Sequence, residues 1–116
     1  MTEQRKYPRF PLTATARIVH AKGDLLYATT ININRGGIGL YSSSPIEEGT
    51  DVRLIIMFKD IRGKDLTEML QGEIAYNYKW HWVYVLGLKF NKLLNHEETP
   101  YLLEYIENCE KIMHIY

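Results

Sequence analysis

Residues 25–42 read LLYATTININRGGIGLYS and predict two strands joined by a short turn. Its first half, Leu25–Ile33, is rich in β-branched and aromatic residues, which favour strands. Residues 34–37 (NRGG) then break the strand with turn-forming residues. A second short strand is predicted over Ile38–Ser42. Because the connection is far shorter than a parallel crossover requires, we expect the two strands to be antiparallel.

Similar segments stand on both sides of this pair. Apolar and polar residues alternate along them, which is the period-two pattern of half-buried strands. The expected strands are Pro11–His20, Leu25–Ile33, Ile38–Ser42, Thr50–Phe58, Leu66–Tyr78 and Trp82–Phe90. Gly72 and Gly87 mark expected bulges or bends in the last pair. Six strands with short connections predict an all-β fold, an antiparallel β-barrel or sandwich.

A C-terminal helix is predicted over about residues 99–113. Thr99 is a good N-cap, and Pro100 suits the first helical position, where its missing N–H costs nothing. Capping from Asn95 would place Pro100 inside the helix, so Thr99 is preferred. The apolar residues at helical spacing are Leu102, Ile106, Cys109 and Met113. We expect this stripe to pack on the chain's own barrel.

Length and composition indicate one globular domain. The chain has 116 residues, of which 46% are hydrophobic and 24% charged, and this excludes disorder as the main state. Apolar runs such as Leu54–Phe58 are far shorter than the roughly 20 residues of a membrane span, so membrane insertion is not expected. Residues 1–9 are polar and basic and show no secretory signal. The single cysteine fits a reducing, cytoplasmic location.

Charge is balanced overall but unevenly distributed. The chain carries 14 basic and 14 acidic side chains. Residues 1–35 have a net charge of +4, and the remainder has −4. Three of the basic residues, Arg5, Lys6 and Arg9, stand within five positions. This asymmetry favours an anionic partner for the first segment, although a solvated basic tail is the alternative.

The sequence contains no recognisable catalytic or metal-binding motif. We therefore do not expect an enzyme, a bound metal or a cofactor. The four histidines are His20, His81, His96 and His114, and none stands at metal-ligand spacing from another or from Cys109. Neither a nucleophile elbow nor a Walker A motif occurs. Cys109 falls on the apolar helix face, where a small buried hydrophobe is expected rather than a nucleophile.

Five aromatic residues alternate strictly in the last predicted strand pair. They are Tyr76, Tyr78, Trp80, Trp82 and Tyr84. Such a run can form a stacking platform for bases. Only Lys79 is interleaved with it, however, and aromatic residues also favour strands for packing reasons. Packing in the core or against a partner is therefore the preferred interpretation, and stacking is the alternative.

Two motifs carry the functional prediction. The first, Arg5-Lys6-Tyr7-Pro8-Arg9, places two arginines four residues apart just before the first strand. Arginine forks suit phosphate oxygens and the guanine O6/N7 edge. The second motif, Asn32-Ile33-Asn34-Arg35-Gly36-Gly37, has two alternate amides on one strand face and glycines that permit close backbone approach. By itself the second motif is also compatible with an ordinary strand connection.

Taken together, these motifs resemble the PilZ domain family. The family pattern Arg-x-x-x-Arg followed by Asp/Asn-x-Ser-x-x-Gly corresponds to Arg5-x-x-x-Arg9 and Asn32-x-Asn34-x-x-Gly37. The resemblance continues through Gly72-Glu73-Ile74 and Gly87-Leu88-Lys89-Phe90 and covers nearly the whole chain. It implies a six-stranded antiparallel β-barrel with a C-terminal α-helix, acting as a receptor for cyclic di-GMP.

The resemblance also implies residue roles. Arg5 and Arg9 would contact phosphates and guanines, Asn32 a guanine edge, and Gly37 would admit the second guanine and its phosphate. Asn34 replaces the family's serine and can reach the ligand or crowd the pocket. Weaker candidates are Lys6, Arg35 and Gly36. The chain departs from the family at Gln4, where an additional arginine is common.

The resulting expectation is a cyclic di-GMP receptor or adaptor. A flexible basic arm, residues 1–11, would fold over the ligand on a barrel domain of residues 12–116 and signal to an unidentified protein partner. The chain would act as a monomer or homodimer. The alternative is a degenerate PilZ-like scaffold that uses its helix and the Trp80/Trp82 region without binding the nucleotide. A single-stranded nucleic acid binder is disfavoured by the zero net charge.

Overall fold

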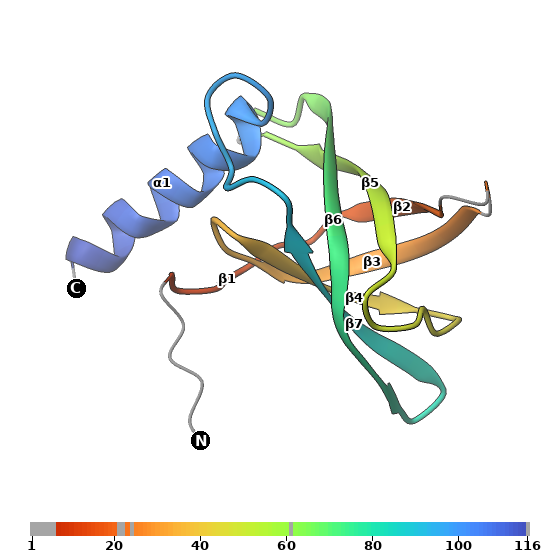
Figure 1. Ribbon diagram of the computed structural model, residues 1–116. Helices are drawn as coiled ribbons and strands as arrows, with labels where there is room; N and C mark the ends of the chain where they lie inside the picture. Colours follow the sequence, from red (N-terminus) through yellow and green to blue (C-terminus); the bar gives the residue numbers. More distant parts are fainter. Residues whose placement is uncertain (1–6, 21–22, 24, 61, 116) are drawn as a thin grey trace.

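The computed structural model describes residues 7–20, 23, 25–60 and 62–115 of the chain. Seven strands and one helix follow one another in the chain, and the strands wrap around a common core (Figure 1). The elements are β1 (Phe10–Pro11), β2 (Thr15–His20), β3 (Leu25–Ile33), β4 (Gly37–Ser42), β5 (Asp51–Lys59), β6 (Asp65–Trp80), β7 (Val83–Phe90) and α1 (Pro100–Ile115). The boundaries of β3 coincide with the prediction, and those of the other elements differ by a few residues.

The sheet closes into a six-stranded antiparallel barrel, as predicted. The strand order is β3-β2-β5-β6-β7-β4, and β4 pairs back with β3. The short β1 also pairs with β3, at Phe10 with Ile33 and Pro11 with Asn32, ahead of β2 along the same side. The sheet therefore begins inside the predicted 1–11 arm, at its last two residues.

The predicted single strand over residues 11–20 is split between β1 and β2. The hydroxyl of Thr30 lies 2.6 Å from the carbonyl oxygen of Leu12 and 3.2 Å from that of Ala14. The buried Thr30 hydroxyl thus hydrogen-bonds to the backbone carbonyls where the predicted strand is interrupted between β1 and β2. Alternation continues through residues 12–14, so the sequence pattern contains no sign of the interruption.

Helix α1 crosses one end of the barrel and buries its first two turns (Figure 1). Leu102, Leu103 and Ile106 belong to the core, and Cys109 packs partly against it. Met113, which was predicted to share this stripe, is exposed, because the last helical turn extends past the barrel. Among the described residues, no helix is both long and apolar enough to cross a membrane.

A buried carboxylate from β6 caps the start of α1. Glu68 is only 6% exposed and accepts hydrogen bonds from the N–H groups of Tyr101 at 2.9 Å and Leu102 at 2.8 Å. Thr99 precedes the helix as predicted, and its carbonyl accepts from the N–H of Leu103. Its hydroxyl, however, accepts from the N–H of Asn95. The capping anion thus comes from a strand far earlier in the chain.

Two register shifts re-aim side chains on one side of the barrel. One lies in β3 between Thr30 and Asn32, and the other lies in β6 between Ile74 and Tyr76. The second shift stands opposite Gly87, which agrees with the bulge expected there, whereas the pairing through Gly72 is regular. An extra residue reverses which face the following side chains occupy. Tyr76, Tyr78 and Trp80 of β6 consequently point outward.

Candidate functional site

The two sequence motifs meet on the outside of the barrel. Arg9 lies just before β1, and its Nη1 donates to Oδ1 of Asn32 at 3.0 Å. Among the residues that the structure describes, the buried Nε of Arg9 has no hydrogen-bond partner. A Cβ at Gly39 would stand 3.0 Å from Asn32 Oδ1 and 3.7 Å from Arg9 Nη1. Because residue 39 has no side chain, the arginine–asparagine pair can lie directly against β4.

Asn34 holds the turn between β3 and β4. Its Oδ1 accepts from the N–H of Gly36 at 2.8 Å, and its Nδ2 donates to the carbonyl of Tyr7 at 3.4 Å. One side chain therefore fastens both its own turn and the end of the N-terminal segment. A Cβ on Gly37 would stand 2.7 Å from the carbonyl oxygen of Leu88, so this position has no room for a side chain.

Arg35 points to the helix. It forms a two-pronged ion pair with Glu110 of α1, with N–O distances of 3.2 and 2.6 Å. The hydrogen bond from Arg35 to Glu110 raises the pKa of the guanidinium further above its usual value. The two side chains are 28% and 24% exposed, so the pair lies at the surface. This turn is thereby coupled to α1.

A second link joins α1 to the N-terminal segment. The hydroxyl of Tyr105 donates to the carbonyl of Pro11 in β1. Burial and the neighbouring Cys109 raise the pKa of Tyr105 to about 12, so this hydroxyl stays a donor at neutral pH. Pro11 is two residues from Arg9. Both ends of the candidate site are thus connected to the same helix.

A row of paired residues runs across four strands at the site. Asn32 of β3 pairs with Gly39 of β4, Gly39 with Gly87 of β7, and Gly87 with Tyr76 of β6. The ring of Tyr76 lies against Gly87, where a Cβ would stand 2.0 Å from its Cε2. The row therefore offers polar groups at one end, an aromatic ring at the other and no side chains between.

Three residues of this row, Asn32, Gly39 and Tyr76, line a hollow of about 260 Å³. The lining residues are Arg9, Ile31, Asn32, Gly39, Tyr41, Tyr76, Tyr78, Trp80 and Val85. They come from four strands and from the segment before β1. Motif residues and the aromatic run, which lie far apart in the sequence, share one surface.

Comparison with known proteins gives the family. A family model described as "PilZ domain" matches residues 3–107. The chain belongs to the PilZ domain family. No curated protein sequence matches it.

Two solved PilZ-related structures share this fold. One is the inhibitor of motility MotI/DgrA of Bacillus subtilis, with 16% identity, a TM-score of 0.76 and alignment over 94% of this chain. The chain spans about half of that protein, 52% of its length. The other is the PilZ domain of YcgR from Escherichia coli with c-di-GMP, at 14% identity and a TM-score of 0.59. That match covers 82% of this chain and 81% of the YcgR domain.

The PilZ motif residues fall into three groups. Arg9 and Asn32 are in direct contact and line the hollow. Asn34, Gly36 and Gly37 build the β3–β4 turn, and Arg35 binds the helix. Arg5 and Lys6 lie outside the described residues. The roles of all these residues in binding remain predictions.

The aromatic run is divided among three environments. Tyr76, Tyr78 and Trp80 line the hollow, and Tyr84 packs against the core. Trp82, at the β6–β7 turn, is 83% exposed. The preferred sequence interpretation was packing in the core or against a partner, and its core half is wrong for Tyr78, Trp80 and Trp82, which are exposed. Packing against a partner stays a prediction. The outward orientation depends on the bulge in β6, which the sequence alternation does not reveal.

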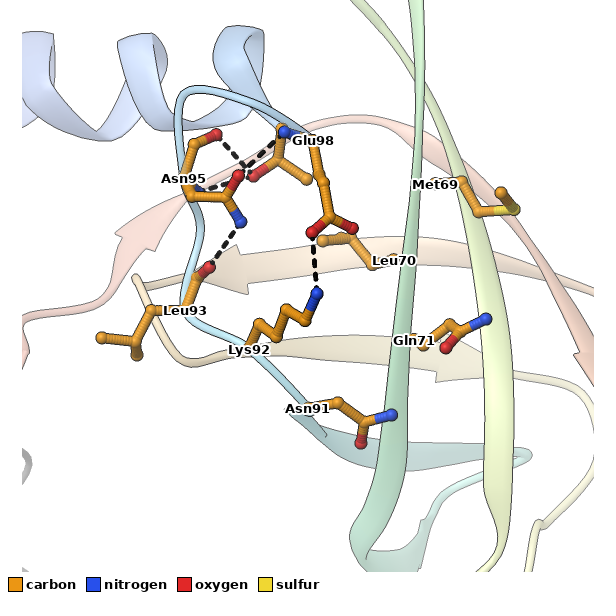
Figure 2. Close-up of a pocket in the computed structure, with 9 residues that line it drawn as sticks. Met69, Leu70, Gln71, Asn91, Lys92, Leu93, Asn95 and Glu98 are labelled. Atoms are coloured by element: carbon orange, nitrogen blue, oxygen red, sulfur yellow. Dashed lines mark hydrogen bonds and ion pairs between the residues drawn. The ribbon is translucent and has the colours of Figure 1, made fainter.

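A second hollow, of about 170 Å³, lies where β6 meets the segment leading into α1. Figure 2 shows Asn95 supporting this segment and Lys92 reaching Glu98, at 3.0 Å, near the surface. None of the motif residues lines it. Across the described residues, no group of three or more histidine, cysteine or acidic side chains is placed to hold a metal ion.

Proposed function

We propose that this protein is a cytoplasmic receptor for cyclic di-GMP that folds its N-terminal arm over the ligand and signals to a protein partner. It acts by binding and catalyses no reaction. The observation that carries the proposal is the contact between Arg9 and Asn32, which unites the two PilZ motifs on one surface. The presence of c-di-GMP on the YcgR PilZ domain supports the choice of ligand.

The chemistry of the Arg9–Asn32 pair suits this ligand. The guanidinium has one nitrogen engaged with the amide and a buried Nε without a partner. Arginine forms bidentate contacts with phosphate and with the guanine O6/N7 edge. A cyclic dinucleotide offers both groups, so it would satisfy the unpaired donor as well as the remaining guanidinium nitrogens.

Signalling would use helix α1. The Arg35–Glu110 pair and the Tyr105–Pro11 hydrogen bond connect α1 to the two segments that carry the motifs. Ordering the arm would change the environment of Pro11, and recruiting Arg35 would weaken its bond to Glu110. Either change alters the surface that α1 presents to a partner.

The binding test is Arg9→Ala, measured by titration calorimetry with cyclic di-GMP. Loss of charged hydrogen bonds worth about 1.5–3 kcal/mol predicts affinity roughly 10- to 100-fold weaker. Arg17→Ala is the matched control, because Arg17 also has a buried, unpartnered Nε but lies on β2, outside the hollow. Equal affinities for Arg9→Ala and the wild type would refute the assigned role.

The degenerate scaffold stays the second candidate, because Asn34 is committed to other contacts. Its two polar atoms hold Gly36 and Tyr7, whereas a ligand would need the family serine's position to be available. Wild-type protein that gives neither heat nor thermal stabilisation with cyclic di-GMP would favour the scaffold. Saturable binding would exclude it.

A further inference from the structure

Four aromatic side chains line the hollow although neither PilZ motif includes them. We call Tyr41, Tyr76, Tyr78 and Trp80 the aromatic wall. Tyr41 lies on β4 and the others lie on β6 beyond its bulge. Tyr41, Tyr78 and Trp80 are exposed, so they contribute little to the core. An exposed group of large rings beside two polar motif residues is typical of a binding surface.

The rings are arranged in two nearly parallel pairs. Tyr76 and Tyr78 have ring centroids 6.1 Å apart and planes inclined by 18°. Tyr41 and Trp80 have centroids 6.3 Å apart and planes inclined by 25°. The close contact of Tyr76 with Gly87 fixes the first pair against the barrel. Within each pair the ring planes are therefore nearly parallel, an arrangement that suits another flat ring.

The size of the hollow limits what it holds. Its volume of about 260 Å³ is below the roughly 300–1,000 Å³ of pockets that enclose a whole drug-sized ligand. One base fits this scale better than an entire dinucleotide. The opposite side carries the Arg9–Asn32 pair, which offers hydrogen-bonding groups. An apolar ligand would leave these groups unpaired, and a phosphate alone would not use the rings.

We propose that the aromatic wall is a stacking subsite for one purine base of the bound cyclic dinucleotide. The base lies face-on to Tyr76 and Tyr78, and its polar edge meets Arg9 and Asn32. Gly39, which pairs with Asn32 in the neighbouring strand, also lines the hollow and has no side chain to fill it. This assignment rests on the proposed function and adds binding residues that the two motifs do not contain.

The first test compares ring removals by calorimetry with cyclic di-GMP. Stacking on an aromatic side chain predicts affinity roughly 5- to 150-fold weaker for Tyr78→Leu and Tyr76→Leu. Tyr78→Phe keeps the ring and should bind like wild type. Tyr27→Leu is the matched control, since Tyr27 is a 67% exposed tyrosine on β3 that does not line the hollow. Thermal unfolding identifies any variant that fails to fold.

The second test uses tryptophan emission. The chain has two tryptophans, Trp80 in the aromatic wall and Trp82 outside it. With Trp82→Phe, cyclic di-GMP should quench the remaining Trp80 along the same titration curve as the calorimetric heat. With Trp80→Phe, the emission of Trp82 should change little.

The outcomes separate this inference from the proposed function. If wild type binds and Arg9→Ala does not, but Tyr76→Leu and Tyr78→Leu bind as tightly as Tyr27→Leu, the stacking subsite is refuted and the receptor function stands. An unchanged Trp80 emission at saturation refutes it as well. Absence of wild-type binding overturns both.

Discussion

The two ends of α1 are held by carboxylates in opposite environments. At the N-terminal end, Glu68 is buried and accepts hydrogen bonds from two helix N–H groups. Farther along, Glu110 forms an ion pair with Arg35 near the surface. The first contact belongs to the core, and the second joins the helix to the β3–β4 turn of the candidate site.

This difference predicts unequal consequences. Buried groups left without partners cost far more than exposed ion pairs contribute, since water replaces the partner at the surface. The start of α1 should therefore remain attached under most changes, while its second half responds to events at the site. Stability and signalling would depend on different ends of one helix.

The largest expected effect comes from Glu68→Ala. The change leaves the N–H groups of Tyr101 and Leu102 without an acceptor beneath the helix and creates a cavity. We expect a loss of about 2–4 kcal/mol in the free energy of unfolding, measured by urea denaturation. A loss below about 1 kcal/mol would mean that the N-terminal end is not the stronger attachment.

The stability contribution of Glu68 should also depend on pH. Burial raises the pKa of Glu68, although the N–H groups of Tyr101 and Leu102 act in the opposite direction. A raised folded-state pKa contributes stability that is present below the ordinary glutamate pKa and is lost as the pH rises through the raised value. The stability advantage of wild type over Glu68→Gln should therefore increase on acidification from about pH 7 toward about pH 4.

The urea midpoints of both proteins across this range provide the measurement. An advantage that shrinks at low pH would show that the hydrogen bonds from the helix N-terminus outweigh burial. Glu110→Gln serves as the comparison. The difference in urea midpoint between this variant and wild type should not follow the titration of Glu68.

The smallest stability effect is expected at the other end of α1. Glu110→Gln removes a partly exposed ion pair worth less than about 1 kcal/mol. If Arg35 contacts a ligand phosphate, as the proposed function implies, Glu110 competes for it, and the variant should bind cyclic di-GMP more tightly, by at most about fivefold. Calorimetry measures this directly. In a protein that already carries Arg35→Ala, adding Glu110→Gln should leave the affinity unchanged.

Weaker binding of cyclic di-GMP by Glu110→Gln would contradict the expected competition between Glu110 and the ligand for Arg35. It would indicate that an attached helix, rather than a released one, is the state that accepts the ligand.

Local patterns in the sequence predicted an antiparallel barrel or sandwich, and the resemblance to the PilZ family favoured the barrel. Leu25–Ile33 is β-rich and bounded by turn residues on both sides, and its boundaries agree with those of β3. Thr99-Pro100 likewise predicted the start of α1. These features depend on neighbouring residues, so they can be recognised without knowledge of the tertiary structure.

Features that depend on tertiary contacts were missed. Glu68 stands at an inward position between Leu66 and Leu70, and a charged residue there was the one available sign of a buried role. Its partners lie far along the chain, on α1. The contact of Arg9 with Asn32 was suggested only through the PilZ resemblance, because spacing within one chain does not determine which segments meet.

The bulge at Ala75 determines which side chains of β6 face the exterior. Odd or even numbering decides whether a strand residue faces the core or the exterior, and one added residue reverses this rule from Tyr76 onward. In a regular strand of the same numbering, Tyr76, Tyr78 and Trp80 would share the inward face of Ile74, and the bulge places them on the outside instead. The bulge thus lets β6 hold one additional residue while Ile74 stays inside and the three aromatic residues stay outside, and alignments of PilZ sequences should allow for one residue more or fewer at this point before comparing positions.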